Sequence, residues 1–280
     1  PHLQAQALPA LRKLLAHTDP LLRASATGSL EPFDAPTRVA AAAPQLADPV
    51  RGVRVEAARV LADVPDEQIP MEWRSARAKA LQEYVDSLTE DADWPSSNIN
   101  LGNLRLRQGR VDEAITAFQR AVSLDAQLPA AYLNLADAYR QARRDTDGEK
   151  TLREAIARMP RNADLHHALG LLLVRKGDKP AGLQSLAQAA RLAPDNPRYA
   201  YVQAIALNSL GKRAEALALL RTTQARHPDD LDTLNALVSI QAEAGDARGA
   251  LVYAEKMAVL MPDDPSLRRL LADLKARAAR

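Results

Sequence analysis

Cysteine is absent from all 280 residues of the sequence. Without it, the chain cannot form disulfide bonds, thiolate zinc sites, a cysteine nucleophile or covalent haem attachment. The absence leaves the cellular compartment open, because secreted proteins built from repeated helices often need no crosslink. We predict that these residues themselves bind no cofactor.

Aromatic residues are scarce as well, at 4% of the chain, whereas alanine and leucine are abundant. Alanine and leucine are both strong helix formers. Hydrophobic residues make up 47% and charged residues 26%, which is ordinary for a soluble folded protein and too apolar for a disordered one. The composition therefore favours an all-α fold with a large buried core.

Long apolar runs are missing too. No uncharged stretch approaches the roughly 18 to 20 residues that a membrane-spanning helix needs, and the longest candidate, which begins at Tyr199, is interrupted by Gln203 and Asn208. The first residues show no basic segment followed by an apolar one, so we predict neither membrane insertion nor a signal peptide within them. Because the chain opens on Pro1, we expect it to be a processed or trimmed piece.

Charge of one sign does not dominate. The net charge is +2; residues 1–94 carry 10 basic and 14 acidic groups, or −4, and residues 95–280 carry +6. The arginines are scattered, without the interleaved aromatic side chains that stack on bases. We therefore expect no nucleic-acid binding.

Catalytic motifs are also lacking. The sequence contains no HExxH, no phosphate-binding glycine loop and no GxSxG, and so predicts no enzyme. His166 and His167 are adjacent, and their side chains diverge by about 100° on a helix, which disfavours a shared metal ion. Aspartates after prolines would suit calcium, but helix capping is the favoured interpretation. These aspartates are Asp229, Asp230, Asp263 and Asp264.

A 34-residue repeat is what the sequence does contain. Prolines that would end helices recur at Pro160, Pro194, Pro228 and Pro262. When residues 95–264 are divided into five blocks of 34, position 8 and position 20 hold mostly small residues, as with Gly170 and Gly182 in the third block. Such residues let two antiparallel helices approach closely, so each block predicts a helical hairpin. The turn between the helices predicts positive φ at glycines, which are Gly109, Gly177, Gly211 and Gly245.

These features resemble the tetratricopeptide repeat. In the second block the residues that fill its consensus positions are Tyr132, Leu135, Tyr139, Leu152, Ala155 and Pro160. The alanines at position 27, among them Ala121 and Ala189, are expected to pack on the next repeat. The block also departs from the pattern, with Arg143 where glycine is usual and Gly148 inside its second helix. The resemblance implies a right-handed α-solenoid of stacked helical hairpins, with five units over 95–264 and a capping helix at 265–280.

Residues 1–94 follow a different pattern. The segments DPLLRASATGSL and DPVRGVRVEAARVL align with a period of 31, which places Arg23 on Arg54. They resemble HEAT-type helix pairs over residues 1–70, with an ordinary helical bundle as the alternative. A polar helix from about Met71 to Thr89 would form a connecting segment, 71–94. We interpret Trp94 at its end as a buried plug rather than a recognition residue.

The first helices of stacked tetratricopeptide repeats usually line a concave groove, and the resemblance implies a non-catalytic scaffold that binds a peptide or protein there. Side chains that are merely hydrated are the alternative. Some tetratricopeptide domains bind the acidic carboxyl tails of chaperones through lysine and arginine residues. The corresponding positions here hold Ile99, Asp164 and Ala168, so a different ligand is expected. The candidate groove residues are Asn103, Arg107, Asn134, Asp137, Arg140, His167, Arg175, Arg198, Tyr201, Asn208 and Asn235.

The order of HEAT-like pairs, connecting helix and repeats is also similar to the carboxyl-terminal region of bacterial multihaem c-type cytochromes that contain tetratricopeptide repeats. That resemblance implies a docking region of an electron-transfer protein, with haem on an upstream domain and a redox protein as a possible partner. It further implies a periplasmic location, with the cytoplasm as an alternative. Two capped ends favour a monomer.

Overall fold

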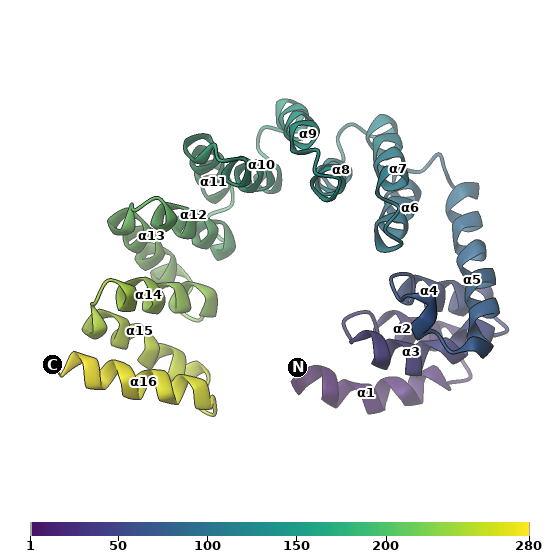
Figure 1. Ribbon diagram of the computed structural model, residues 1–280, viewed down its shortest axis with the longest axis horizontal. Helices are drawn as coiled ribbons and strands as arrows, with labels where there is room; N and C mark the ends of the chain where they lie inside the picture. Colours follow the sequence, from purple (N-terminus) through teal and green to yellow (C-terminus); the bar gives the residue numbers. More distant parts are fainter. Residues whose placement is uncertain (1, 280) are drawn as a thin grey trace. The chain divides into compact units, whose positions relative to one another are not determined.

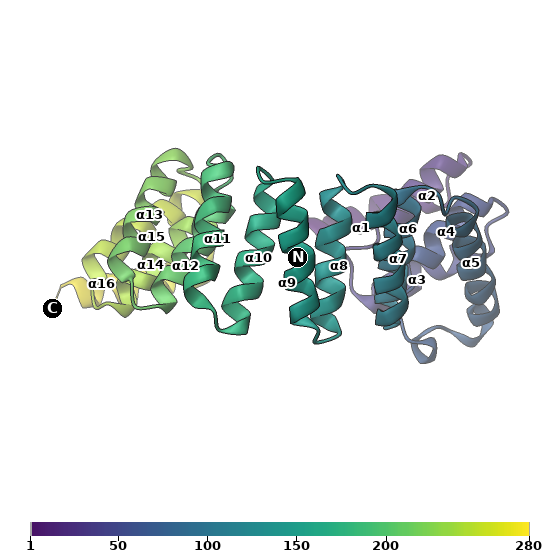
Figure 2. The same cartoon turned by 90° about the horizontal axis from the view of Figure 1, so that it is seen from above.

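A computed structural model describes residues 2–279 of the chain (Figures 1 and 2). Those residues form sixteen α-helices and two short 3₁₀-helices, and no strand is present among them. The all-α prediction is therefore confirmed. The chain divides into two compact units, of which unit 1 ends at Arg143 and unit 2 begins at Arg144. Each unit is described by itself.

Unit 1 contains eight α-helices and both 3₁₀-helices. The helix predicted from about Met71 to Thr89 is present as α5, one residue longer than expected. The elements are α1 (His2–Leu15), α2 (Pro20–Gly28), α3 (Ala35–Ala42), η1 (Ala43–Ala47), α4 (Arg51–Val60), η2 (Asp66–Gln68), α5 (Met71–Glu90), α6 (Pro95–Arg107), α7 (Val111–Leu124) and α8 (Pro129–Gln141).

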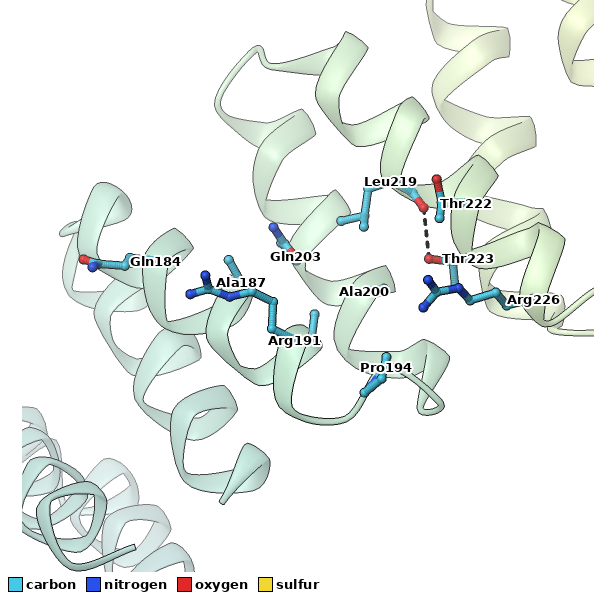
Figure 3. A pocket seen from close by; sticks show the side chains of 11 residues that line it. Gln184, Ala187, Arg191, Pro194, Ala200, Gln203, Leu219, Thr222, Thr223 and Arg226 are labelled. Carbon is cyan, nitrogen blue, oxygen red and sulfur yellow. Dashed lines mark hydrogen bonds between the residues drawn. The ribbon is translucent and has the colours of Figure 1, made fainter. Parts of the chain in front are cut away.

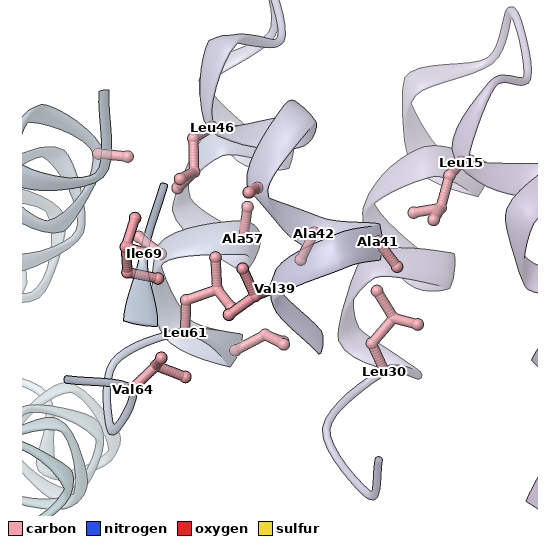
Figure 4. Close-up of a cluster of buried hydrophobic side chains, with 14 of the residues drawn as sticks. Leu15, Leu30, Val39, Ala41, Ala42, Leu46, Ala57, Leu61, Val64 and Ile69 are labelled. Atoms are coloured by element: carbon pink, nitrogen blue, oxygen red, sulfur yellow. The ribbon is translucent and has the colours of Figure 1, made fainter. Parts of the chain in front are cut away.

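The amino-terminal part of unit 1 has its own apolar core. Helices α2 and α4 pack against each other, and α4 also packs against α5. Figure 4 shows aliphatic side chains from the helices of this part and from the segments between them, with Leu30, Leu61 and Ile69 fully buried. The buried residues of this core are leucine, valine, isoleucine and alanine. Because no large aromatic side chain is buried between the helices, they can pack closely together.

Two arginines predicted to be equivalent make equivalent bonds in this part. Arg23 on α2 donates two hydrogen bonds to Asp48, at 2.7 and 3.0 Å, and Arg54 on α4 donates two to Glu83, both at 2.9 Å. Hydrogen bonds from Arg23 lower the pKa of Asp48, and those from Arg54 lower the pKa of Glu83. Arg23 thus ties α2 to the segment between η1 and α4, and Arg54 ties α4 to α5. The HEAT-like organisation of residues 1–70 stays a prediction, supported by this recurrence.

We expect Arg23→Met to destabilise unit 1 by about 2–3 kcal/mol, because it leaves the buried Asp48 carboxylate without its two guanidinium donors. The exposed Arg12 on α1 provides a matched control, and Arg12→Met should change stability by less than about 0.5 kcal/mol. Urea unfolding followed by circular dichroism measures both variants. Equal stabilities for the two would contradict a structural role for the Arg23–Asp48 pair.

Unit 2 is a succession of helical hairpins. Helices pair within the hairpins as α10 with α11, α12 with α13 and α14 with α15, and each hairpin also contacts the next one (Figure 1). The elements are α9 (Asp145–Arg158), α10 (Ala163–Lys176), α11 (Lys179–Leu192), α12 (Pro197–Ser209), α13 (Arg213–Arg226), α14 (Leu231–Glu243), α15 (Ala247–Leu260) and α16 (Pro265–Ala278).

Helix capping explains the polar residues that follow the repeated prolines. Each proline lies two residues beyond the end of a second helix, and the residue two further on accepts hydrogen bonds from the first turn of the next helix. Asp230, for example, accepts from the Thr233 amide at 2.9 Å. The capping interpretation is confirmed for Asp230 and Asp264, whereas the adjacent Asp229 and Asp263 are not the cap residues. The cap residues recur every 34 residues as Asn162, Asn196, Asp230 and Asp264.

The small residues at positions 8 and 20 face each other, as predicted. In the hairpin of α10 and α11, a Cβ atom added to Gly170 would lie 3.0 Å from the backbone oxygen of Gly182 and 2.7 Å from Leu186 Cγ. Ala204 and Ala216 occupy the same positions in the next hairpin and are fully buried. Backbone contact at these positions therefore sets how closely the two helices of a hairpin pack.

Turn geometry confirms the role predicted for the recurrent glycines. Gly109, Gly177, Gly211 and Gly245 have φ values of 71°, 92°, 75° and 82°. Arg143 occupies the equivalent position in the second block and adopts φ 58°, as the single non-glycine residue with positive φ among residues 2–279. The repeat therefore requires a left-handed residue here even where the sequence supplies no glycine.

Arg143→Gly should stabilise the protein by about 1 kcal/mol, because glycine adopts positive φ without steric cost. Gly211→Ala should destabilise it by about as much, since its added Cβ would meet no atom within 4 Å and only backbone strain acts. Denaturation midpoints of the two variants provide the measurement. A destabilised Arg143→Gly protein would show instead that the arginine side chain holds the turn.

The interpretation of Trp94 as a buried plug is wrong. Its side chain is 67% exposed, at the residue immediately before α6. The seam between α5 and α6 is filled instead by aliphatic and tyrosine side chains, including Tyr84, Leu88 and Leu104. The position of Trp94 immediately before a helix does not by itself indicate whether its side chain is buried or exposed.

Candidate functional site

The predicted binding residues lie on the first helices of the 34-residue blocks. These helices are α6 and α8 in unit 1 and α10, α12 and α14 in unit 2. The first-helix face denotes positions 2, 5, 9, 12 and 13 of each block, together with Asn134. None of the predicted residues is buried. Their hydrogen bonds differ between the two units.

In unit 1, the predicted residues of α6 and α8 bond to one another. Asn134 Nδ2 donates to Asn103 Oδ1 at 3.4 Å, and Arg140 Nε donates to Asp137 Oδ1 at 2.8 Å. Gln141 also donates to Asp137, at 3.0 Å. Part of the capacity of these groups to bind a ligand is therefore already used within the unit.

Arg107 is part of an ionic cluster inside unit 1. Its guanidinium pairs with Glu31 and donates to the Arg59 carbonyl at 3.4 Å, while Arg59 donates to Glu31 and Glu56 at 2.6 and 2.7 Å. Burial lowers the pKa of Arg107. Arg107 lines a hollow of about 280 Å³ beside Tyr84. Its contacts join α6 to the preceding helices, which is a structural role.

Unit 2 leaves more of its predicted residues without partners. Arg175 is engaged, since its guanidinium donates to Asp145 at 2.7 Å. The side chains of Asn208 and Asn235 make no hydrogen bond within residues 2–279, and Arg198 forms no ion pair there. Tyr201 packs its ring against the core between α12 and α13. The unpaired groups therefore gather on α12 and α14.

His167 on α10 lies at the centre of a small polar cluster. Its ring packs against Tyr199, with 5.1 Å between centroids, and its buried Nδ1 atom has no hydrogen-bond partner. Burial lowers the pKa of His167, and the nearby Arg198 charge lowers it further. Tyr199 in turn donates to Asp164, and burial together with that bond raises the pKa of Tyr199 to about 12. Both effects favour the neutral form of the His167 ring.

Sequence reasoning missed two apolar residues of the same face. Leu171 on α10 and Ile205 on α12 both occupy position 9, and they are 43% and 40% exposed. In unit 1 the same position holds Asn103 and Asp137. The 34-residue alignment carried the signal, because an apolar side chain at a solvent-facing position is a candidate contact.

Neither a metal site nor a membrane span is evident in the described part of the chain. Among residues 2–279, no three histidine, aspartate or glutamate side chains gather closely enough to hold a metal ion. Over the same residues, every helix is too short or too polar to cross a bilayer. His166 and His167 point to different partners, since His166 Nε2 lies 2.9 Å from the Pro160 carbonyl oxygen.

The low pKa of His167 makes stability depend on pH. The unfolded chain takes up a proton at its His167 near pH 6.5, whereas the folded chain resists that proton until a lower pH. Stability from this group is therefore present above about pH 6.5 and is lost as the pH falls below it. His167→Phe keeps the ring contact with Tyr199 and should lose less stability between pH 7 and pH 5 than the unaltered protein. Identical pH profiles in urea unfolding would contradict this assignment.

Comparison with protein families identifies repeats in both units. A family model described as TPR repeat matches residues 102–142, and a model described as tetratricopeptide repeat matches residues 167–230 and 201–267. The resemblance drawn from the spacing of prolines and small residues is thereby confirmed. The matches begin inside the 95–264 segment predicted to hold the repeats, and the last of them extends three residues beyond it.

Relatives and solved structures agree with these matches. The chain is 32% identical over 147 residues to cellulose synthase 2 operon protein C of Komagataeibacter xylinus, and 28% identical over 158 residues to cytochrome c-type biogenesis protein CycH of Rhizobium meliloti. These alignments span 51% and 56% of this chain, but only 11% and 32% of the two relatives. The crystal structure of yeast Tom70 aligns with 98% of this chain, and the alignment covers 58% of the Tom70 chain. The TM-score is 0.63 at 18% sequence identity, which shows a shared fold.

Proposed function

Because this chain carries tetratricopeptide repeats within residues 102–142 and 167–267, and so belongs with the tetratricopeptide-repeat proteins, we propose that it is a scaffold that binds an extended segment of a partner protein. The fold is that of protein–protein interaction scaffolds. The binding surface of this proposal is the first-helix face of unit 2, on α10, α12 and α14.

One observation carries the choice of unit. The polar groups of the first-helix face are bonded to neighbours in unit 1, whereas the side chains of Asn208 and Asn235 have no hydrogen-bond partner within the described residues of unit 2. A polar group that already has a protein partner gives up that bond to bind a ligand, so its net contribution is small. The unpaired groups of unit 2 lose only water and keep more of the binding energy.

The arrangement suits an extended peptide. An asparagine amide both donates and accepts, so Asn208 and Asn235 can bind the amide and carbonyl groups of a peptide main chain. The exposed Leu171 and Ile205 offer apolar contact for side chains of the same peptide. Because these residues project from packed helices, little conformational entropy is lost when the partner binds.

The test begins with peptides selected from a random peptide library on the 280-residue protein. Ile205→Ser and Asn208→Ala should each weaken the selected peptides by about tenfold, since a central contact is typically worth 1 kcal/mol or more. Asn134→Ala is the matched control on α8, where the amide is already bonded to Asn103, and it should change affinity by less than about twofold. Fluorescence anisotropy measures the dissociation constants.

Two outcomes would count against the proposal. Equal losses for Asn134→Ala and Asn208→Ala would remove the distinction between the units. Unchanged affinity in both unit 2 variants, with circular dichroism showing intact helices, would place the selected peptides on another surface. In either case the first-helix face of unit 2 would not be the binding site.

A second candidate is association with c-type cytochromes. The similarity to a cytochrome c-type biogenesis protein favours it, as does the resemblance of the chain to a docking region of multihaem cytochromes. In this proposal the 280 residues dock a periplasmic cytochrome or its redox partner, as a monomer, and any haem lies outside these residues. Titration with a purified c-type cytochrome tests the idea, and an absence of binding at low and moderate salt would contradict it.

A further inference from the structure

Two hollows on unit 2 lie away from the first-helix face. One, of about 490 Å³, lies between α9 and α11 over α10, and the other, of about 620 Å³, lies between α11 and α13 over α12. None of the predicted groove residues lines either hollow. Gln184 and Arg191 on α11 line both of them, so the two hollows adjoin along one helix.

The hollows are equivalent sites of successive repeats. Arg153, Ile156 and Ala157 on α9 stand 34 residues before Ala187, Ala190 and Arg191 on α11, and His166 and Leu169 on α10 stand 34 before Ala200 and Gln203 on α12. Each hollow is therefore formed by two consecutive second helices and the first helix between them. Together they form what we name the outer groove.

Two of the three arginines that line the outer groove have no carboxylate partner among the described residues. Arg191 and Arg226 make no ion pair within residues 2–279, although Arg191 donates to Gln188 at 2.6 Å. Arg153 is paired with Glu149 at 2.8 Å, and Glu149 does not line the groove. No aspartate or glutamate is among the residues that line either hollow.

Equivalent places in other repeats have different interactions. Between α13 and α15, Lys256 Nζ donates to Gln224 Oε1 at 3.1 Å and bridges the two second helices. In unit 1, the equivalent hollow over α6 is lined by Arg120 and Glu113, and Arg120 pairs with Asp93 at 3.3 Å. Charges at these places are paired or bridged inside the protein, whereas Arg191 and Arg226 of the outer groove have no carboxylate partner within residues 2–279.

Figure 3 shows how the second hollow is lined. Arg191 comes from α11, Arg226 comes from α13, and Gln203 on α12 lies between the two helices. The amides of Gln184 and Gln203 make no hydrogen bond within the described residues, while Thr223 Oγ1 donates to the Leu219 carbonyl at 3.0 Å. No phenylalanine, tyrosine or tryptophan lines the groove, so His166 is the single ring among its lining residues on which a base could stack.

We propose that the outer groove binds an acidic, extended peptide segment of a partner protein. Carboxylates of the segment pair with Arg191 and Arg226, glutamine amides bind its main chain, and its small side chains cover Ala187, Ala190 and Ala200. Charge complementarity selects this occupant, because guanidinium groups form strong, often bidentate hydrogen bonds with carboxylates. The site is separate from the first-helix face, so the failure of either proposal leaves the other standing.

The probe is a fluorescein-labelled nonapeptide in which glutamate alternates with alanine and glycine, and its lysine counterpart is the reference. The glutamate peptide should bind the 280-residue protein, and more weakly as salt rises, while the lysine peptide should not bind. Arg191→Gln and Arg226→Gln should each weaken binding by roughly five- to tenfold, as expected for loss of a charge-assisted hydrogen bond. Arg213→Gln removes the same charge from an exposed site on α13 and should change affinity by less than about twofold.

Several results would overturn the proposal. Absence of binding at low salt would do so, as would equal losses for Arg213→Gln and Arg226→Gln, because the attraction would then come from net charge alone. Losses in Ile205→Ser or Asn208→Ala, with none in the two arginine variants, would move the acidic peptide to the first-helix face. An oligo(dT) strand that binds more tightly than the glutamate peptide, with the same dependence on Arg191 and Arg226, would identify nucleic acid as the occupant.

Discussion

Close contact between two helix backbones is the interaction on which the hairpins of this protein depend. At Gly170 and Gly182 a single added carbon atom would meet backbone or core atoms at 3.0 Å or less. The small residues at positions 8 and 20 let the two helices of a hairpin meet along a narrow seam, and the remaining apolar residues then pack on the next hairpin. Each repeat buries its surface only against its neighbours, so each must carry small residues at the same positions. This requirement accounts for the recurrence of small residues every 34 residues in the sequence.

The seam also determines which side chains reach solvent. Once one side of a first helix is committed to its partner and another to the next repeat, the remaining side is exposed whatever residues it carries. Leu171 and Ile205 are exposed for this reason, although both are hydrophobic. On the second helices the same geometry leaves hollows between successive repeats, and the side chains at these places differ from repeat to repeat, as with the hydrogen bond from Lys256 to Gln224. Functional differences between repeats therefore depend on surface substitutions, while the scaffold itself is unchanged.

The two units use similar surfaces differently. In unit 1, Arg23, Arg54 and Arg107 form ion pairs with carboxylates of other segments and so hold the helices together. In unit 2 the first-helix and second-helix surfaces keep arginines and amides without partners in the described residues. A polar group contributes most to binding when it has no competing partner in the free protein. This difference, rather than the repeat pattern, is why we assign both proposed binding surfaces to unit 2.

The sequence by itself determined the helical class, the pairing of helices in hairpins, the caps at Asp230 and Asp264, and the left-handed turns. All of these are local: they depend on the φ range of glycine, the missing amide of proline and the reach of a short polar side chain. Only the tertiary structure decided that Trp94 is exposed, that Arg107 is engaged by Glu31, and that Arg191 and Arg226 face hollows without a carboxylate. Those outcomes depend on which residues, distant in sequence, come into contact, and a pattern with a period of 34 fixes the positions of side chains without fixing their partners.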